Sequence, residues 1–164
     1  MADSQPRLRE PGQRVSPRAR TLWRVEAALE GAFTLLVALV VGYVWAPFDV
    51  RWWMPALLGA AVAAYALVVP AWKYAVHRWE VTATAVYTQT GWWARERRIA
   101  PMSRIQTVDY AEGPLQRLFG LASVTVTTAS AAGALEIAGL DRDRARALIE
   151  ELTLKADTAP GDAT

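Results

Sequence analysis

The chain has 164 residues and a formal net charge of +2; 53% of its residues are apolar, eight are tryptophan and none is cysteine. The lack of cysteine excludes a disulfide framework and thiolate-bound metals, and so small a net charge gives no reason to expect nucleic-acid binding. The apolar residues gather between Ala27 and Trp72, and the rest has the composition of an ordinary soluble protein. The length allows one ordinary domain, or a smaller domain with an extension.

Residues 1–22 predict a disordered, basic N-terminal tail. They contain three prolines and several arginines but few large apolar side chains. A segment of this composition buries too little apolar surface to offset the conformational entropy lost on folding. Its arginines would be attracted to an anionic membrane surface.

Two apolar segments, residues 27–46 and 52–72, follow this tail. Each has about the 20 residues that a helix needs to cross a bilayer, and neither shows the polar stripe of a buried helix in a soluble protein. The first segment starts too late for a cleavable signal peptide, and a second span follows it at once. The short connection PFDVR permits only a tight reversal, so residues 23–76 are predicted to form a transmembrane hairpin. A hydrophobic hairpin of a soluble protein is the alternative.

The charged residues predict the orientation of this hairpin. Arginines and a lysine flank its two outer ends, whereas the connecting loop has only Arg51, beside Asp49. Because basic residues are enriched in cytoplasmic loops, both termini are expected in the cytoplasm, in a multi-pass protein of the cell membrane. Tryptophan and tyrosine gather at both ends of the spans, as expected at membrane interfaces. Glu30, near the start of the first span, is expected to reach the lipid headgroups or to pair with a neighbouring arginine.

Residues 77–155 are predicted to form a cytoplasmic α+β domain. From Arg78 onward, short runs of strand-forming residues succeed one another, each bounded by turn residues. One of them, ASVTVTTA, alternates cleanly and places Val124 and Val126 inward. The spacing becomes helical in LDRDRARALIEELTLKA, and this helix is expected to cover the sheet, with Asp141 as its N-cap. The final residues, 156–164, are expected to be a disordered polar tail.

Two irregular features are predicted between the strands. Ile105 and Val108 are three residues apart, which interrupts the alternation of a strand and predicts a β-bulge. After a Gly-Pro pair, Leu115, Leu118 and Phe119 have the spacing of one helical face. This short helix is expected to act as a plug whose apolar residues cap the open sheet.

The segment from Trp79 to Leu152 resembles the bacterial pleckstrin-homology (PH-like) domains of YdbS-like membrane proteins. The resemblance is carried by RWEVT, by Gly91 before a charged strand, by RIQTVDYAEGPLQRLFGLASVTVTTA, and by IAGL before a helix. Two transmembrane helices before such a domain also match the family pattern. The chain departs from the pattern at SAAGA, which follows the Thr-Ala pair. The resemblance implies a strongly bent antiparallel sheet, nearly a barrel, closed by the C-terminal helix, and it implies no catalytic role.

The sequence offers no motif for catalysis, so we expect a protein that is not an enzyme and needs no cofactor or metal. The one histidine, His77, lies in the linker after the second span, with no carboxylate near it in sequence. Ser103 and Ser123 have no evident base, and no glycine-rich phosphate loop is present.

A candidate binding surface is more credible than an active site. The run RERR places several cations on a strand near the membrane anchor, and alternation directs Arg95 and Arg97 to one face and Glu96 and Arg98 to the other. Such a face is either simply solvated or contacts the phosphate of anionic lipids or an acidic partner. The full candidate set is Arg95, Arg97, Arg98, Arg104, Gln106, Asp109 and Arg117.

Two kinds of function fit these features. In the first, the protein is a membrane-anchored scaffold or adaptor whose PH-like domain binds a protein partner or further copies of itself. In the second, the domain binds anionic lipid headgroups of the inner leaflet. A role as a subunit of a transport or export assembly would require partner subunits, because two helices alone enclose no pathway.

Overall fold

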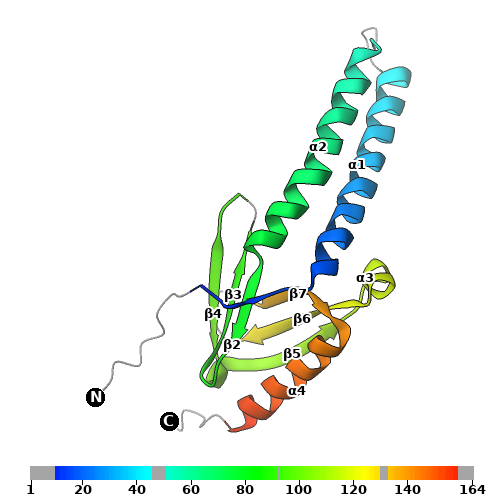
Figure 1. Ribbon diagram of the computed structural model, residues 1–164. Coiled ribbons are helices and arrows are strands. Elements are labelled where there is room, and N and C mark those ends of the chain that lie inside the picture. Colours follow the sequence, from blue (N-terminus) through cyan, green and yellow to red (C-terminus); the bar gives the residue numbers. More distant parts are fainter. Residues whose placement is uncertain (1–9, 46–50, 92, 130–132, 159–164) are drawn as a thin grey trace.

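The computed structural model describes residues 10–45, 51–91, 93–129 and 133–158, and it confirms the α+β prediction (Figure 1). Helices α1 (Pro17–Trp45) and α2 (Trp53–Val76) form a hairpin that stands on a domain of two antiparallel sheets. The other elements, in chain order, are β1 (Gln13–Arg14), β2 (Arg78–Val81), β3 (Ala85–Thr90), β4 (Glu96–Pro101), the 3-10 turn η1 (Met102–Arg104), β5 (Ile105–Ala111), α3 (Pro114–Phe119), β6 (Leu121–Thr128), β7 (Leu135–Asp141) and α4 (Arg142–Thr158).

The helical hairpin turns its apolar side chains outward. Phe33, Val44 and Leu67 are all more than 60% exposed, and both helices are long and apolar enough to cross a membrane. Such a surface is unfavourable in water and favourable against lipid tails. Gly31 allows the two helices to approach closely, because a Cβ at this position would lie 2.2 Å from a methyl carbon of Val62.

Helix α1 begins at Pro17, earlier than the predicted span. Ser16 precedes it as the N-cap residue, since its hydroxyl oxygen accepts a hydrogen bond from the backbone N–H of Arg18 at 3.3 Å. Proline suits the first helical position, where its missing N–H has no partner to lose. The segment 10–22, expected to be part of a disordered tail, therefore contains a strand and the first turns of a helix; residues 1–9 lie outside the described residues.

The first turns of α1 belong to the core of the domain. Ala19, Leu22 and Trp23 are 0%, 1% and 6% exposed, and their spacing places them on one helical face. This face crosses β7 at Gly139, where a Cβ would lie 2.6 Å from the Cβ of Ala19. Gly139 also has a positive φ of 77°, a conformation that favours glycine. Burial of these few apolar residues is the reason why a segment with the composition of a tail is structured.

The first sheet has the strand order β1-β2-β3-β4. Strand β1 pairs with β2 through Gln13↔Trp79 and Arg14↔Arg78, although the whole helical hairpin lies between them in the sequence. The hairpin is thus inserted between two neighbouring strands of one sheet. The helical hairpin is therefore joined to the domain at both of its ends, through two paired strands of one sheet.

The second sheet has the order β5-β6-β7. Its register shifts between Ile105 and Thr107, which confirms the predicted bulge, and a further irregularity lies between Ala122 and Val124. Val124 and Val126 are both fully buried, as their alternation predicted.

Helix α4 covers the second sheet with Ala145, Leu148 and Leu152, all of which are fully buried. These residues join Trp79 of β2 in one hydrophobic core. The predicted helix that covers the sheet is therefore present, although Asp141 is the last residue of β7 and accepts a hydrogen bond from the Ser16 hydroxyl at 2.8 Å.

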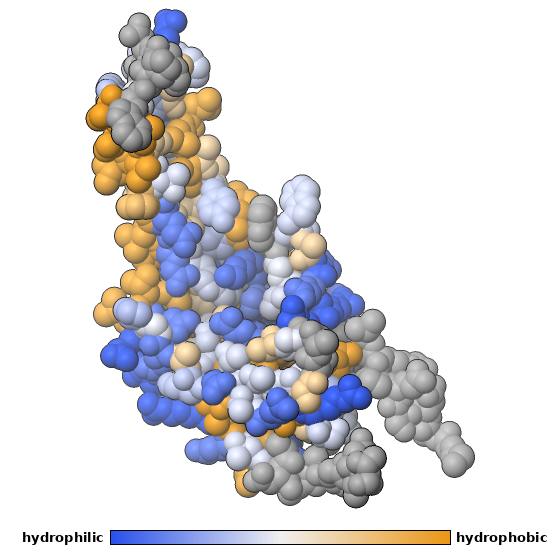
Figure 2. All heavy atoms as spheres, turned by 180° about the vertical axis from the view of Figure 1, so that it is seen from behind, coloured by the Kyte–Doolittle hydropathy of each residue, from blue (hydrophilic) through white to orange (hydrophobic). Residues whose placement is uncertain are grey.

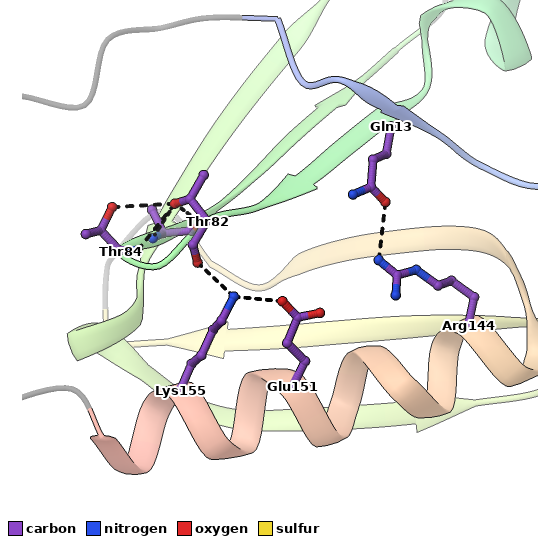
Figure 3. Close-up of polar contacts among 7 residues, drawn as sticks. Gln13, Thr82, Thr84, Arg144, Glu151 and Lys155 are labelled. Atoms are coloured by element: carbon purple, nitrogen blue, oxygen red, sulfur yellow. Dashed lines mark hydrogen bonds and ion pairs between the residues drawn. The ribbon is translucent and has the colours of Figure 1, made fainter.

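Polar contacts also join α4 to the first sheet (Figure 3). The Nζ of Lys155 donates to the carbonyl oxygen of Thr82 at 3.3 Å, in the turn between β2 and β3. Near the other end of the helix, Arg144 donates to the side-chain oxygen of Gln13 at 3.4 Å. Helix α4 thereby closes the two sheets over their shared core.

The short helix α3 confirms most of the predicted plug. The backbone N–H of Gly113 donates to the side-chain oxygen of Gln116 at 3.0 Å, and Gly120 ends the helix in the left-handed conformation. Leu115 and Phe119 pack against the core. Leu118 differs from the prediction, since it is 81% exposed and so does not cap the sheet.

Candidate functional site

Three of the predicted cations lie on or next to β4, and all three contact partners from distant parts of the chain. Arg97 donates to Glu10 at 3.0 Å and to the side-chain oxygen of Gln89 at 2.8 Å. Gln89, which is 2% exposed, donates in turn to the carbonyl oxygen of Val76 at 3.1 Å. Arg97 therefore links the N-terminal segment to the end of α2. Arg95 lies 3.8 Å from the same Glu10 carboxylate.

Arg98 has partners of its own on β4 and at the start of β7. It lies 2.6 Å from Glu96, and it donates to the carbonyl oxygen of Ala134 at 3.0 Å. Much of the positive charge of RERR is therefore neutralised within the chain.

The other predicted residues lie elsewhere in the domain. Arg104 is in η1, Gln106 and Asp109 are on β5, and all three are exposed. Arg117, on α3, lies 3.7 Å from Glu112. The structure separates the predicted set into a β4 group near the hairpin and a second group along η1, β5 and α3.

A polar pocket of about 460 Å³ lies where the hairpin meets the domain. The surface changes from apolar along the helices to polar around their base (Figure 2). The pocket contains two cations and three carboxylates from both helices and both sheets, with hydroxyl groups between them. Its lining residues are Trp23, Glu26, Lys73, His77, Thr88, Thr90, Glu96, Arg98, Gln116, Ala134, Glu136 and Ala138.

His77 is the buried titratable group of this pocket. It is 7% exposed, and its Nδ1 has no hydrogen-bond partner among the described residues. The ring stacks edge-on against Trp23, with 5.3 Å between centroids, and the Nζ of Lys73 lies 4.4 Å from the Trp23 ring centre. Burial, with a smaller effect of the Lys73 charge, lowers the pKa of His77 from 6.5 to about 4. The imidazole is therefore neutral at physiological pH.

A second cluster surrounds Glu112, just after β5. Its carboxylate accepts a hydrogen bond from the Tyr110 hydroxyl and lies 2.6 Å from Arg142 and 3.7 Å from Arg117. The Tyr110 hydrogen bond, together with the charges of Arg142 and Arg117, lowers the pKa of Glu112. Since Arg142 begins α4, the cluster fixes the end of β5 to α3 and α4.

Strand β5 itself is an open edge of the second sheet. Among the described residues it is paired with β6 alone, and it forms the terminal strand of the sheet. Its exposed side chains include Gln106, Thr107, Asp109 and Tyr110. An edge of this kind presents unpaired backbone N–H and C=O groups to solvent.

The sequence profile of the family described as Bacterial PH domain matches residues 25–156. The chain belongs to this family. It is also similar to the UPF0699 transmembrane protein YdbS of Bacillus subtilis (strain 168), with 29% identity over 153 residues that cover 90% of this chain and 96% of the relative. No solved structure gives a significant match. With its two apolar helices, the protein is a membrane protein with a bacterial PH domain, as the sequence motifs implied.

In the part of the chain that the structure describes, no three His, Asp or Glu side chains lie close enough together to hold a metal ion. The pocket offers cations, carboxylates and hydroxyls for binding. The terminal strand β5 offers the backbone groups of a sheet edge. Sequence analysis missed the roles of Glu10, Gln89 and Glu112, because their partners are distant in the sequence or on other elements. Only the placement of His77 directly after a span could have drawn attention to the pocket.

Proposed function

We propose that this membrane-anchored PH domain is a non-enzymatic scaffold or adaptor that holds a protein partner, or a second copy of the chain, at the inner face of the cell membrane. The partner adds a strand along the open edge of β5. Strand addition to a sheet edge is a common mode of peptide recognition, in which backbone hydrogen bonds supply affinity and side-chain contacts supply specificity. The observation that carries the proposal is this seven-residue terminal strand.

The other strands at the edges of the two sheets have features that discourage the addition of a strand, which supports the choice of β5. Strand β1 has only two residues, and β4 bears Glu96, Arg97 and Arg98 and ends at Pro101, features that discourage pairing. The start of β7 is covered by the Arg98 contact with Ala134, and the N–H of Ser16 donates to a carbonyl oxygen of this strand at 2.9 Å. Strand β5 carries a bulge and one charged residue and has α4 packed against it, but among the described residues no second strand pairs with it.

The proposed orientation rests on the distribution of basic residues about the hairpin. Lys73 and Arg78 lie at the domain end of α2, and further arginines lie in the first turns of α1. Only Arg51 lies at the opposite end. The positive-inside bias therefore favours a domain, and both termini, in the cytoplasm.

Site-specific photo-crosslinking in cells tests the added strand. A benzophenone side chain at Thr107 or Asp109 on β5 is expected to give a covalent adduct, because a strand on this edge would lie within contact distance of both positions. An adduct at twice the 18.0 kDa chain mass would identify a second copy, and another mass would identify a protein partner. Gel mobility and mass spectrometry of the purified adduct provide the measurement.

The matched control is Ala83, an equally solvent-exposed position in the turn between β2 and β3. It is expected to give no adduct of the same mass. Equal crosslinking from Ala83, or none from either β5 position, would contradict strand addition at β5.

The pocket favours a second candidate function, the binding of an anionic lipid headgroup. It lies at the domain ends of both spanning helices, and Lys73 would face a phosphodiester while the pocket carboxylates accept from headgroup hydroxyls. Native mass spectrometry of the full-length protein tests this candidate by the amount of phosphatidylglycerol retained. Lys73→Gln is expected to lower retention several-fold, and Arg146→Gln, at an exposed position of α4 outside the pocket, is expected to leave it unchanged. Equal retention by both variants would exclude the pocket as the lipid site.

A further inference from the structure

The hairpin of β3 and β4 presents a large aromatic side chain to solvent. Trp93, in the turn between these strands, is 89% exposed, more than any other large hydrophobic residue described. Arg95, on the same turn, has a side chain that is 59% exposed. A tryptophan exposed to this degree is unusual on a domain surface that meets only water.

The paired strands give the end of this hairpin a defined direction. Strands β3 and β4 are paired up to Thr90↔Glu96, and this end of the paired strands lies on the same side of the domain as α1 and α2 (Figure 1). Gly91 shapes the turn with a positive φ of 115°, and a Cβ there would lie 1.8 Å from the carbonyl oxygen of Ala94. Trp93 therefore lies at the end of two paired strands that extend toward the membrane.

The strand register sets the level of Trp93 relative to the bilayer. Gln89 pairs with Arg78, immediately after α2, and is fixed to Val76 by its 3.1 Å hydrogen bond. Beyond this pair the hairpin extends by about three residues, or about 10 Å at 3.3 Å per residue. An α-helix rises about 1.5 Å per residue, so the same length measured back along α2 leads to the neighbourhood of Trp72. Trp93 thus lies level with the aromatic residues at the domain end of the spans.

We propose that the β3–β4 turn is a third membrane contact, in which Trp93 lies in the headgroup region of the inner leaflet beside α2. Tryptophan prefers this region because its ring is apolar and its N–H can remain hydrogen-bonded. Arg95, which is 59% exposed and lies 3.8 Å from Glu10, follows Trp93 on the same turn. The two helices and the turn together fix the tilt of the domain on the membrane, and hence the direction in which its other surfaces face. This contact requires no partner at β5 and no ligand in the pocket.

Spin labelling of the full-length protein in vesicles tests the proposal, and the chain suits it because it contains no cysteine. Trp93→Cys carries the label at the turn. Ala83→Cys, in the turn at the opposite end of β2 and β3, is the water-exposed control, and Phe33→Cys on the outer face of α1 is the lipid reference. The vesicles contain phosphatidylethanolamine and phosphatidylglycerol. Electron paramagnetic resonance measures the collision rates of each label with oxygen, which concentrates in lipid, and with a nickel chelate, which remains in water.

The ratio of oxygen to nickel collisions at position 93 is expected to exceed that at position 83 several-fold and to lie below that at position 33, as suits a label in the headgroup region. Equal ratios at positions 93 and 83 would place the turn in water and overturn the proposal. Low collision rates with both reagents at position 93 would indicate cover by protein, which would also overturn it.

Discussion

Replacing Leu22 with alanine is expected to destabilise the whole PH domain by about 2–5 kcal/mol, the usual cost of truncating a buried leucine. Leu22 is 1% exposed and shares one hydrophobic core with Trp79 of β2 and Leu148 of α4. The loss is a large fraction of the stability of a typical domain, about 5–15 kcal/mol. Urea unfolding of the full-length protein in detergent micelles, followed by near-ultraviolet circular dichroism, measures the change.

Thr21→Ala is the matched control, because Thr21 is the preceding residue of α1 and is exposed. Its effect is expected to stay within about 0.5 kcal/mol, as for most surface substitutions. If Leu22→Ala unfolded at the same urea concentration as Thr21→Ala, the first turns of α1 would not belong to the core.

The start of α1 illustrates where sequence reasoning failed and why. Ser16 followed by Pro17 is a local signal for the beginning of a helix, and Ala19, Leu22 and Trp23 have helical spacing. The average composition of the segment, rich in arginine and proline, outweighed these signals. Its burial depends on β7 and Gly139, more than a hundred residues later, so no local pattern could establish that these few apolar residues have a surface to cover.

The features that sequence did predict depend on local patterns. The spans follow from long apolar runs, the bulge from the spacing of Ile105 and Val108, and the helix α3 from a Gly-Pro start and a Gly end. The candidate site depends instead on long-range pairing. Glu10 and Arg97 are 87 residues apart, and the exposure of the β5 edge follows from the order of strands in a sheet.

The insertion of the hairpin between β1 and β2 has a consequence for experiments on this domain. A fragment that starts after α2 lacks β1, the buried Val15 that follows it, and the buried face of α1, including Leu22. Such a fragment would expose the part of the core that these residues cover. The binding properties of the domain are therefore best measured on the full-length chain in a membrane or micelle.

Lowering the pH from 7 to 4 is expected to cost the folded protein about 3 kcal/mol through His77 alone. Burial depresses the folded-state pKa of His77 to about 4, below its ordinary value of 6.5. Between these two pH values the unfolded chain binds a proton at His77 that the folded chain does not. The contribution of His77 to the free energy of unfolding is therefore fully present above pH 6.5 and is lost as the pH falls toward 4. Each tenfold difference in proton affinity corresponds to about 1.4 kcal/mol, which gives the expected total.

The comparison of wild type with His77→Gln isolates this contribution. Glu26, Lys73, Glu96, Arg98 and Glu136 line the same pocket and are present in both proteins. Glu112, whose pKa is lowered, also favours the folded state at neutral pH and loses this effect in acid, but equally in both. The unfolding free energy of His77→Gln, measured in micelles at pH 7 and pH 4, is therefore expected to fall by about 3 kcal/mol less than that of the wild type. If the unfolding free energies of the two proteins fell equally, His77 would bind a proton as readily in the folded protein as in the unfolded chain. The burial of His77 against the Trp23 ring argues against this outcome.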